Sequence, residues 1–369
     1  MIRILHVLPR LRRGGSQAVV MNLFRQLDRT RFQFDFIIFT QDRDDYYDEI
    51  IQLGGKIFHF TKFNGKNFSK IKKEWKCFFK SHPEYKILHS HVRSFASIYL
   101  PIARKFNVKT IIHSHSSSNE KGFKGLIKSL MEYPLRFQAD YLFACSTEAG
   151  KWLFGKKSVS KDNYLFFPNA IDFERFVFDA AEREATRKRI LPSHNCFLVG
   201  HVGGLETPKN HSFLLDVFSE LTKLISNAYL LLVGDGTLEK EIKKKAIDLK
   251  LEDKVIFAGL QTNVSPFLSA MDILVFPSLW EGLPVTLVEA QSSGLQCLVS
   301  SNITKDVQIT NLITYMPLSE GSLSWAKQIV QLSNNQVDRF NFRKENNFYA
   351  FDIKKAVASL ESFYEKILD

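Results

Sequence analysis

The stretch ILVFPSLWEGLPVTLVEAQSSGLQCLVSS, residues 273–301, holds two short apolar runs separated by a loop and a helical segment. ILVFPS and QCLVSS have the length and composition of buried strands. Between them, Glu281, Gly282 and Pro284 mark a loop, and Glu289 lies in the helix expected after it. A strand, a helix and a second strand in this order predict parallel strands of one sheet with the helix packed on a face.

The same alternation continues in both directions from this stretch. The second half adds the strand-like runs CFLVGHV, AYLLLVGDG and KVIFAG, and the first half has RILHVLP, FDFIIFT, KIFHF, KILHSH, TIIHSH and YLFACS. We therefore predict two α/β domains, residues 1–172 and 173–350, with a helical stretch over about 351–369. Ligands of such sheets bind beyond the carboxyl ends of the strands, so a cleft between two facing domains is the expected site.

The composition is that of a folded protein and argues against several classes. Of 369 residues, 45% are hydrophobic and 24% are charged, which excludes a disordered chain. Apolar runs are too short to span a bilayer, and the start MIRILHVLPRLRRGG resembles a first strand more than a signal peptide. The four cysteines form no CxxC pair, so we expect reduced thiols, a cytosolic protein and no zinc site.

The charge is distributed unevenly along the chain. Residues 1–170 contain 29 Lys and Arg against 14 Asp and Glu, whereas the remainder contains 21 against 25. This asymmetry indicates that the first half meets an anionic surface or substrate, although lysine-rich surface decoration would also produce it. Nucleic acid is a weaker interpretation, because the basic residues are dispersed and no known nucleic-acid-binding motif is present.

Two glycine loops follow strands and precede helices. The first contains Gly14 and Gly15, and the second contains Gly203 and Gly204 with Lys209 a few residues later. Glycine lets a backbone approach a ligand closely, helix starts favour anions, and Lys209 would neutralise a diphosphate. Each loop taken alone is also compatible with an ordinary turn and a surface lysine. The GxGxxG motif is absent, which disfavours a nicotinamide dehydrogenase.

The strongest pattern is SLWEGLPVTLVEAQSSG, residues 278–294. Carboxylates such as Glu281 and Glu289 accept hydrogen bonds from sugar hydroxyls, and the backbone N–H groups of the Gly-Leu-Pro turn can hold phosphate oxygens. One carboxylate in the loop and one in the following helix would grip two parts of an extended polar ligand.

EGLPVTLVEAQSSG resembles the signature of the family 4 glycosyltransferases. The resemblance covers essentially the whole chain, from RRGGSQAVVMNLFRQLD to the closing FDIKKAVASLESFYEKIL, which resembles the helix that crosses back to the first domain. It implies retaining enzymes of the GT-B architecture, with two facing Rossmann-like domains, an interdomain cleft and an acceptor-side first domain. The most similar subgroup makes bacterial exopolysaccharide and capsule sugars.

The resemblance implies roles for single residues. Glu289 resembles the glutamate that binds the donor ribose, and Glu281 the one that faces the donor sugar, helped by the backbone of Gly282, Leu283 and Pro284. The remaining donor-site residues implied are Gly15 and Lys209 at the diphosphate and Gln261, Asn263 and Val264 around the base. His115 resembles the histidine near the transferred sugar, with His113 as the alternative on the same strand face.

One position departs from the family pattern. Gly204 stands where the family usually has an arginine that acts on the diphosphate together with the lysine. Removing one such electrostatic group typically costs roughly 2.7–4 kcal/mol in catalysis, or about 100- to 1000-fold. His201 or one of Arg10, Arg12 and Arg13 is a candidate substitute.

The sequence therefore predicts a retaining hexosyltransferase-type enzyme that uses a nucleotide-diphosphate sugar, with a UDP-sugar expected, and a saccharide or polyprenyl-linked acceptor. No cofactor or metal is expected, because Lys209 and loop amides would balance the diphosphate and because the acidic residues Asp42, Asp44 and Asp45 are interpreted as solvated. The alternatives are a weakly active or inactive binding protein, motivated by Gly204, and, less favoured, a nucleotide-sugar epimerase.

The segment KGFKGLIKSLMEYPLRF, residues 121–137, mixes lysines and an arginine with large apolar residues. Such a segment can lie on an anionic membrane near a lipid-linked acceptor. It would place the protein at the inner face of the plasma membrane. An amphipathic helix packed on the sheet is the alternative.

Overall fold

The structure, a computed structural model, describes residues 1–115, 123–335, 337–342 and 351–369, without the side chains of residues 123 and 124. The chain divides into two compact units. The first consists of Met1–Ile171 together with Ala350–Asp369, and the second of Asp172–Tyr349.

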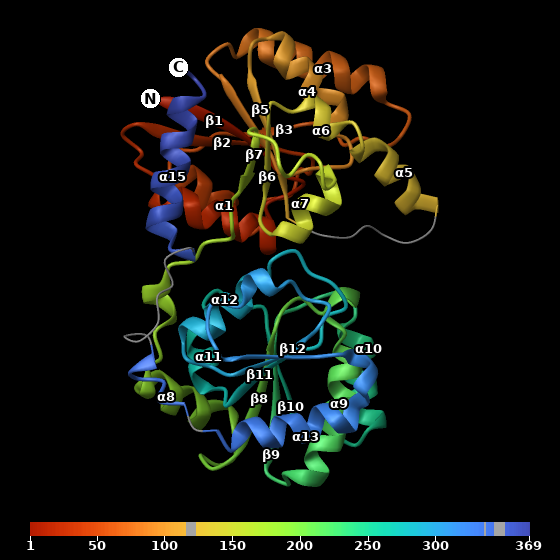
Figure 1. The fold of residues 1–369 in the computed structure, drawn as a ribbon, viewed down its shortest axis with the longest axis vertical. Helices are drawn as coiled ribbons and strands as arrows, with labels where there is room; N and C mark the ends of the chain where they lie inside the picture. The colour runs from red at the N-terminus through yellow and green to blue at the C-terminus, as the bar shows by residue number, and fades with distance from the viewer. Residues whose placement is uncertain (116–122, 336, 343–350) are drawn as a thin grey trace. The chain divides into compact units, whose positions relative to one another are not determined.

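The first unit contains a seven-stranded sheet in the order β3-β2-β1-β4-β5-β6-β7, with every pairing parallel (Figure 1). Its strands are β1 Ile2–Val7, β2 Phe32–Ile38, β3 Ile57–His59, β4 Ile87–Ser90, β5 Lys109–Ser114, β6 Tyr141–Ala144 and β7 Tyr164–Phe166. Its helices are α1 Gly15–Gln26, α2 Tyr47–Gln52, α3 Phe68–Ser81, α4 Ala96–Lys105, α5 Phe123–Glu132, α6 Leu135–Gln138, α7 Thr147–Phe154 and α15 Ile353–Lys366.

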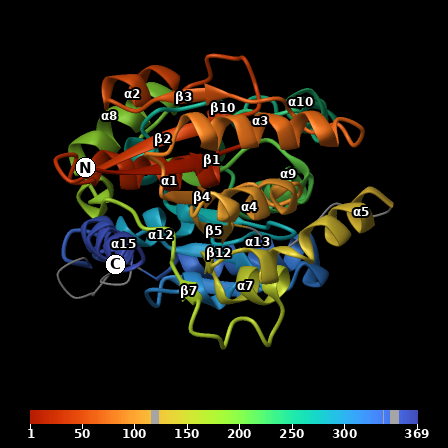
Figure 2. The same ribbon diagram turned by 90° about the horizontal axis from the view of Figure 1, so that it is seen from above.

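Helices cover both faces of this sheet. On one face, Leu5, Leu88 and Ile112 pack against aromatic and aliphatic residues of α3, α4, α6 and α7, and α3 and α4 lie side by side (Figures 1 and 2). On the other face, α1 contacts α15, and the ring of Tyr364 on α15 packs edge-on against Phe34. The last helix is thus part of the first unit's core.

The second unit contains a six-stranded parallel sheet in the order β10-β9-β8-β11-β12-β13. Its strands are β8 Phe197–Val202, β9 Ala228–Val233, β10 Val255–Gly259, β11 Ile273–Phe276, β12 Cys297–Ser300 and β13 Ile313–Met316. Its α-helices are α8 Ala180–Ile190, α9 His211–Leu224, α10 Glu239–Asp248, α11 Ser265–Ala270, α12 Val285–Ser292 and α13 Gly321–Ser333. Four 3-10 turns, η1 Phe173–Phe176, η2 Thr207–Lys209, η3 Lys305–Val307 and η4 Leu318–Glu320, complete the unit in the residues described.

The predicted parallel α/β architecture is confirmed in both units, and two strands were missed. β7 and β13 are three and four residues long and each forms the outer edge of its sheet. Edge strands pair on one side only, so a short run suffices to form one and leaves little periodicity to read in the sequence.

In both sheets the strand order reverses beside the unit's first strand, between β1 and β4 and between β8 and β11. Ligands of doubly wound sheets bind outside the carboxyl ends of the strands at this switch point. The loops that follow these four strands are therefore the places in which to look for a site.

All four cysteines are free thiols, with Cys77 exposed and the other three buried. Among the residues described, no helix combines the length and the apolar character needed to cross a bilayer.

Candidate functional site

The loop after β8 is shaped by two glycine segments that pack on each other. A side chain could not be accommodated at Gly234 or Gly236, where a Cβ would lie 2.2 Å from the Gly203 oxygen and 2.4 Å from the Leu205 oxygen. The Gly203 N–H donates to the Val233 oxygen at 2.9 Å, which extends the pairing of β8 with β9 by one residue. The GDG segment, residues 234–236, therefore supports the turn at Gly203.

Lys209 and Glu281 meet at the switch point of the second unit. The Lys209 Nζ lies 2.6 Å from the Glu281 Oε1, and the two side chains are 21% and 15% exposed. Lys209 also lies 5.1 Å from the centre of the Phe276 ring at the end of β11. Hydrogen bonds join the two loops, from the Leu279 N–H to the Pro208 oxygen at 2.8 Å and from the Asn210 amide to the Pro277 oxygen at 3.2 Å.

This pair places a cation and a carboxylate side by side, and both side chains are partly accessible to solvent. Because the side chains are largely withdrawn from water, their interaction is stronger than that of an exposed ion pair. A bound diphosphate would have to attract Lys209 in competition with Glu281, whose other oxygen lone pairs can accept hydrogen bonds from hydroxyl groups.

Gly204 has room for a side chain. A Cβ there would lie 3.6 Å from the Asp235 oxygen and from the Glu206 Cγ, which is ordinary van der Waals contact. By contrast, a Cβ at Gly203 would lie 3.1 Å from the Lys209 Cε. Neither steric crowding nor backbone conformation thus requires glycine at position 204.

The candidate substitutes for the missing arginine are differently placed. His201 is fully buried, its Nδ1 lies 2.9 Å from the Val275 oxygen, and burial lowers its pKa well below the ordinary value. It is therefore neutral and supplies no cation. Arg10 pairs with Asp44 at 3.3 Å, so part of its charge is already compensated.

The sequence pattern of the acidic loop after β2 predicts solvated side chains. In the structure, two of its carboxylates also accept hydrogen bonds from the backbone. The Asp44 carboxylate accepts the Leu11 N–H at 3.1 Å, and the Asp45 carboxylate accepts the Arg13 N–H at 2.8 Å. These contacts hold the loop between β1 and α1 in place, which local sequence could not reveal because the partners lie on different loops.

Glu289 lies on α12, as predicted, in a half-buried position. Burial raises the pKa of its carboxyl group to about 7, against the opposing effect of the positive Arg175 on η1. Gly282, Leu283 and Pro284 are buried in the loop before α12, and Pro284 precedes the helix without a side-chain cap. The first N–H groups of α12 are therefore available to oxygen atoms of a ligand.

Sequence reasoning did not single out Arg175. It lines a cavity of about 290 Å³ together with Asn263 and Asp179. It lies in the segment FPNAIDFERF, residues 167–176, to which the sequence pattern assigns no role. A signal existed in the charged pair Glu174-Arg175 within that apolar segment.

The loop between β10 and α11 carries the three residues predicted around the base. Gln261 donates its amide to the Ala258 oxygen at 2.5 Å, Asn263 accepts the Ser265 N–H at 3.2 Å, and Val264 immediately precedes α11. Of these, Asn263 shares a cavity with Arg175, whereas Gln261 is hydrogen-bonded within its own loop.

In the first unit, Gly15 is the first residue of α1 and Gly14 precedes it without a side-chain cap. A Cβ at Gly15 would meet no heavy atom within 4 Å, so the helix start borders open space. This is the arrangement in which backbone N–H groups receive an anion.

The two candidate histidines differ in exposure. His113, inside β5, is 1% exposed, whereas His115, just beyond the strand, is partly exposed. Their rings stack with centroids 4.0 Å apart. Burial, with a smaller contribution from the nearby Arg93, lowers the pKa of His115 to about 3, so the ring is neutral at physiological pH. Of the two, His115 is the better placed to reach a ligand.

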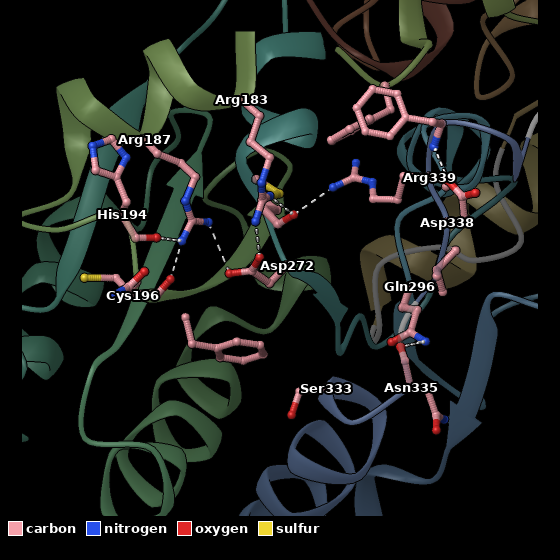
Figure 3. A pocket seen from close by; sticks show the side chains of 17 residues that line it. Arg183, Arg187, His194, Cys196, Asp272, Gln296, Ser333, Asn335, Asp338 and Arg339 are labelled. Atoms are coloured by element: carbon pink, nitrogen blue, oxygen red, sulfur yellow. Dashed lines mark hydrogen bonds and ion pairs between the residues drawn. The ribbon is translucent and has the colours of Figure 1, made fainter. Parts of the chain in front are cut away.

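A different cavity, of about 620 Å³, lies where strands of the second unit begin (Figure 3). Arg183, Arg187 and Arg339 line it around Asp272. The N–H groups of Arg183 and Arg187 donate to the Asp272 carboxylate and to the backbone oxygens of Ser269, Ala270, Met271, His194 and Cys196. Those of Arg339 donate to the backbone oxygens of Leu268, Ser269, Met271 and Ser293. The arginines thus bind the end of α11, and this cavity is not the predicted phosphate site.

The structure therefore defines a protein of two Rossmann-like α/β units, the second of which holds a lysine and a glutamate at its switch point. Residues 13–175 match the family model described as Glycosyltransferase Family 4, and residues 182–346 match that of Glycosyl transferases group 1. The chain is 33% identical to EpsF of Bacillus subtilis (strain 168), named as a glycosyltransferase, over 98% of this chain and 96% of that protein. The chain belongs to the family 4 glycosyltransferases.

Two further similarities concern the fold and the wider family. The UDP-Gal:alpha-D-GlcNAc-diphosphoundecaprenol alpha-1,3-galactosyltransferase of Escherichia coli is 24% identical over 98% of this chain and 96% of its own length. The crystal structure of HepE from Anabaena in complex with UDP-glucose superposes with a TM-score of 0.76 at 16% identity, covering 98% of this chain and all of that one. The likeness to such solved structures shows the GT-B type of fold.

Proposed function

We propose that this protein is a retaining glycosyltransferase that moves a sugar from a UDP-sugar to a lipid-linked or saccharide acceptor in the synthesis of a bacterial surface polysaccharide. The observation that carries the proposal is the Lys209–Glu281 pair at the switch point of the second unit. It offers a cation for a diphosphate beside a carboxylate for sugar hydroxyls. The names of the galactosyltransferase and of the HepE complex, which specify UDP-sugars, support this choice of donor.

In this proposal, Lys209 and the first N–H groups of α12, those of Val285 and Thr286, balance the charge that develops on the leaving diphosphate. Glu281 accepts hydrogen bonds from the donor sugar, and Glu289 accepts them from the ribose. The start of α1 at Gly15 contributes further N–H groups to the phosphates. Since lysine and amides supply this stabilisation, we propose that transfer needs no metal ion or cofactor.

We propose a one-step route to the retained configuration that the family resemblance implies. Glu281 is paired with Lys209 and Glu289 is assigned to the ribose, so neither is proposed as a nucleophile. The acceptor oxygen would form the new glycosidic bond on the face from which the diphosphate leaves, and its proton would pass to a phosphate oxygen. Retention of configuration therefore arises in one step, without a covalent glycosyl-enzyme.

Calorimetry with UDP tests the donor site. At pH 8, where the Glu289 carboxyl group is ionised, Glu289→Ala should weaken UDP binding about 10- to 100-fold, because a hydrogen bond to a charged group contributes roughly 1.5–3 kcal/mol. Glu252→Ala, at an exposed position before β10, is the matched control and should leave affinity unchanged. Unchanged affinity in Glu289→Ala would reject the donor-site assignment.

A second candidate function, a weakly active or inactive nucleotide-sugar-binding protein, is favoured by Gly204 alone. It makes the same prediction for UDP binding and differs in turnover. An epimerase would convert the donor without any acceptor, which a coupled assay on the UDP-sugar alone would detect.

We further propose that α5 and α6 attach the protein to the inner face of the plasma membrane. Leu126, Leu130 and Phe137 are 57%, 66% and 61% exposed, and Lys128 and Arg136 lie among them in the sequence. This exposure argues against the alternative of a helix packed on the sheet. Lys121, also assigned to this surface from the sequence, lies outside the described residues, and the side chain of Lys124 is not described.

Sedimentation with vesicles tests the membrane surface. The protein should bind phosphatidylglycerol vesicles at low salt, and Leu130→Asp should reduce the bound fraction several-fold because it places a charge in the apolar surface. Phosphatidylcholine vesicles and high salt serve as controls. Equal sedimentation of the wild type with either lipid, or none with either, would reject the proposal.

A further inference from the structure

Five histidines lie on one face of the first unit's sheet. His6 belongs to β1 and is in register with His89 of β4, and His91 follows β4. His113 belongs to β5, and His115 lies just beyond that strand. The two HSH sequences thus place alternate residues on the same face of neighbouring strands. His6, His89, His91 and His113 are at most 9% exposed.

Hydrogen bonds between ring nitrogens connect these residues in two chains. In the first, the His6 Nδ1 lies 3.0 Å from the His91 Nε2, and the His91 Nδ1 lies 2.8 Å from the His115 Nε2. In the second, the Tyr364 hydroxyl lies 2.8 Å from the His89 Nδ1, and the His89 Nε2 lies 3.3 Å from the His113 Nδ1. The first chain ends at the partly exposed His115.

The rings of the first chain are neutral. Burial lowers the pKa of His6 and of His115 to about 3, and it lowers the pKa of His91 well below the ordinary value. A neutral imidazole has one N–H donor and one acceptor nitrogen. If His91 donates from Nδ1, it must accept at Nε2, and the reverse holds if it donates from Nε2.

This restriction couples the tautomers of all three rings. When hydrogen bonds run from His6 towards His115, every ring carries its hydrogen on Nδ1. When they run from His115 towards His6, every ring carries it on Nε2. In both cases the Nε2 of His115 is engaged by His91. Its Nδ1 is buried and has no partner among the described residues, so it is the nitrogen that a ligand group entering the site would satisfy.

Nitrogen atoms of His91, His113 and His115 come within 4.8 Å of one another, so a bound metal ion is the competing interpretation. The lone pairs of imidazole lie in the ring plane. The planes of His113 and His115 are stacked at an interplanar angle of 26°, so their lone pairs run alongside each other instead of converging. The ring-to-ring contacts have hydrogen-bond lengths, which favours the chain.

We infer that His91, supported by His6, is a positioning residue for His115: its hydrogen bond to Nε2 fixes the orientation of that ring and leaves Nδ1 alone to meet a hydroxyl group of the transferred sugar. The identity of the ligand rests on the proposed function, whereas the coupled tautomers do not. The hydrogen-bonded rings of His6, His91 and His115 are neutral, so His115 acts by hydrogen bonding and not as a cation.

Two-bond hydrogen–nitrogen correlation spectra of protein labelled with ¹⁵N-histidine test the coupling directly. After dialysis against EDTA, His6, His91 and His115 should show one common tautomer and no protonation between pH 6 and 8. Single histidine variants assign the signals. Mixed tautomers, a charged ring, or zinc that survives EDTA and shifts these signals would overturn the inference, whether or not the protein proves to be a transferase.

Kinetics separate positioning from simple structural support. His91→Phe should lower kcat/KM for the UDP-sugar about fivefold, the equivalent of one ordinary hydrogen bond. His91→Asn should recover most of it, because its amide occupies the place of Nδ1 and can bond His115. UDP affinity should not change in either variant, since UDP lacks the sugar.

The control is His194→Asn, at an exposed position of the second unit. Melting temperatures identify variants that merely unfold. Equal losses in His91→Phe and His91→Asn, or a loss of UDP affinity in folded protein, would contradict a positioning role. Failure of the wild type to bind any UDP-sugar would reject the proposed function and leave the spectroscopic result standing.

Discussion

The carboxyl ends of the two sheets carry groups of different charge, although both sheets reverse strand order beside the unit's first strand. In the second unit the switch point holds a charged pair, Lys209 and Glu281, in partly accessible positions. In the first unit the corresponding strand ends hold neutral imidazoles that bond to one another. Under the proposed function, charge would act on the donor's phosphates and neutral hydrogen bonding on the transferred sugar.

The largest expected effect comes from removing the charge of the second unit. Lys209→Ala should lower kcat about 100- to 1000-fold, because one electrostatic group at a developing charge contributes roughly 2.7–4 kcal/mol. Initial rates of UDP release measure this effect. Lys223→Ala, which removes an exposed lysine paired with Glu220, is the control and should be neutral. A loss of tenfold or less would mean that backbone N–H groups carry most of the stabilisation.

A second prediction adds charge at the same place. Gly204→Arg should raise transfer or donor hydrolysis about tenfold or more, because the position has room for a side chain and a second cation would act on the diphosphate. Gly203→Arg should not, since its Cβ would press on Lys209. If Gly204→Arg folds and turnover stays the same, the missing arginine does not limit this enzyme.

The smallest effect concerns pH. The Glu289 pKa, raised to about 7 in the folded protein without ligand, means that the folded state binds more protons than the unfolded state between the ordinary pKa and pH 7. The stabilisation of the folded state that results is fully present below the ordinary carboxyl pKa of 4.5 and is lost as the pH rises through 7. Glu289→Gln should therefore melt about 2–4 °C above the wild type at pH 8 and together with it at pH 5. A difference independent of pH would show that Glu289 does not titrate in this range.

The sequence was informative where function depends on local pattern. Glu289 was correctly expected in a helix, and Glu281 in the preceding loop, because strand, turn and helix signals follow one another there. The contact between Lys209 and Glu281 was not foreseen, since it joins loops that are far apart in sequence. The coupling of His6 to His115 through His91 was missed for the same reason, because it depends on strand order and register across the sheet.

For the first unit, the sequence predicted the sheet but not the hydrogen bonds between its loops. The alternation of strands identified its sheet, while the hydrogen bonds from Asp44 and Asp45 to the loop before α1 escaped notice. Acidic residues after a strand look alike whether they face water or hold a neighbouring loop, and only the three-dimensional arrangement distinguishes the two cases.

The placement of α15 has a consequence for how the protein is made. Its residues complete the core of the first unit, with Tyr364 fully buried and bonded to His89, and the pairing of Ile171 with Asp352 fixes the approach of the chain. On a ribosome that adds about 5–20 residues per second, the first unit must wait roughly 10–35 s for the second to be synthesised before its last helix arrives. During that interval α15 does not yet cover the face of the sheet that carries the histidines. The first unit is therefore exposed to aggregation during synthesis.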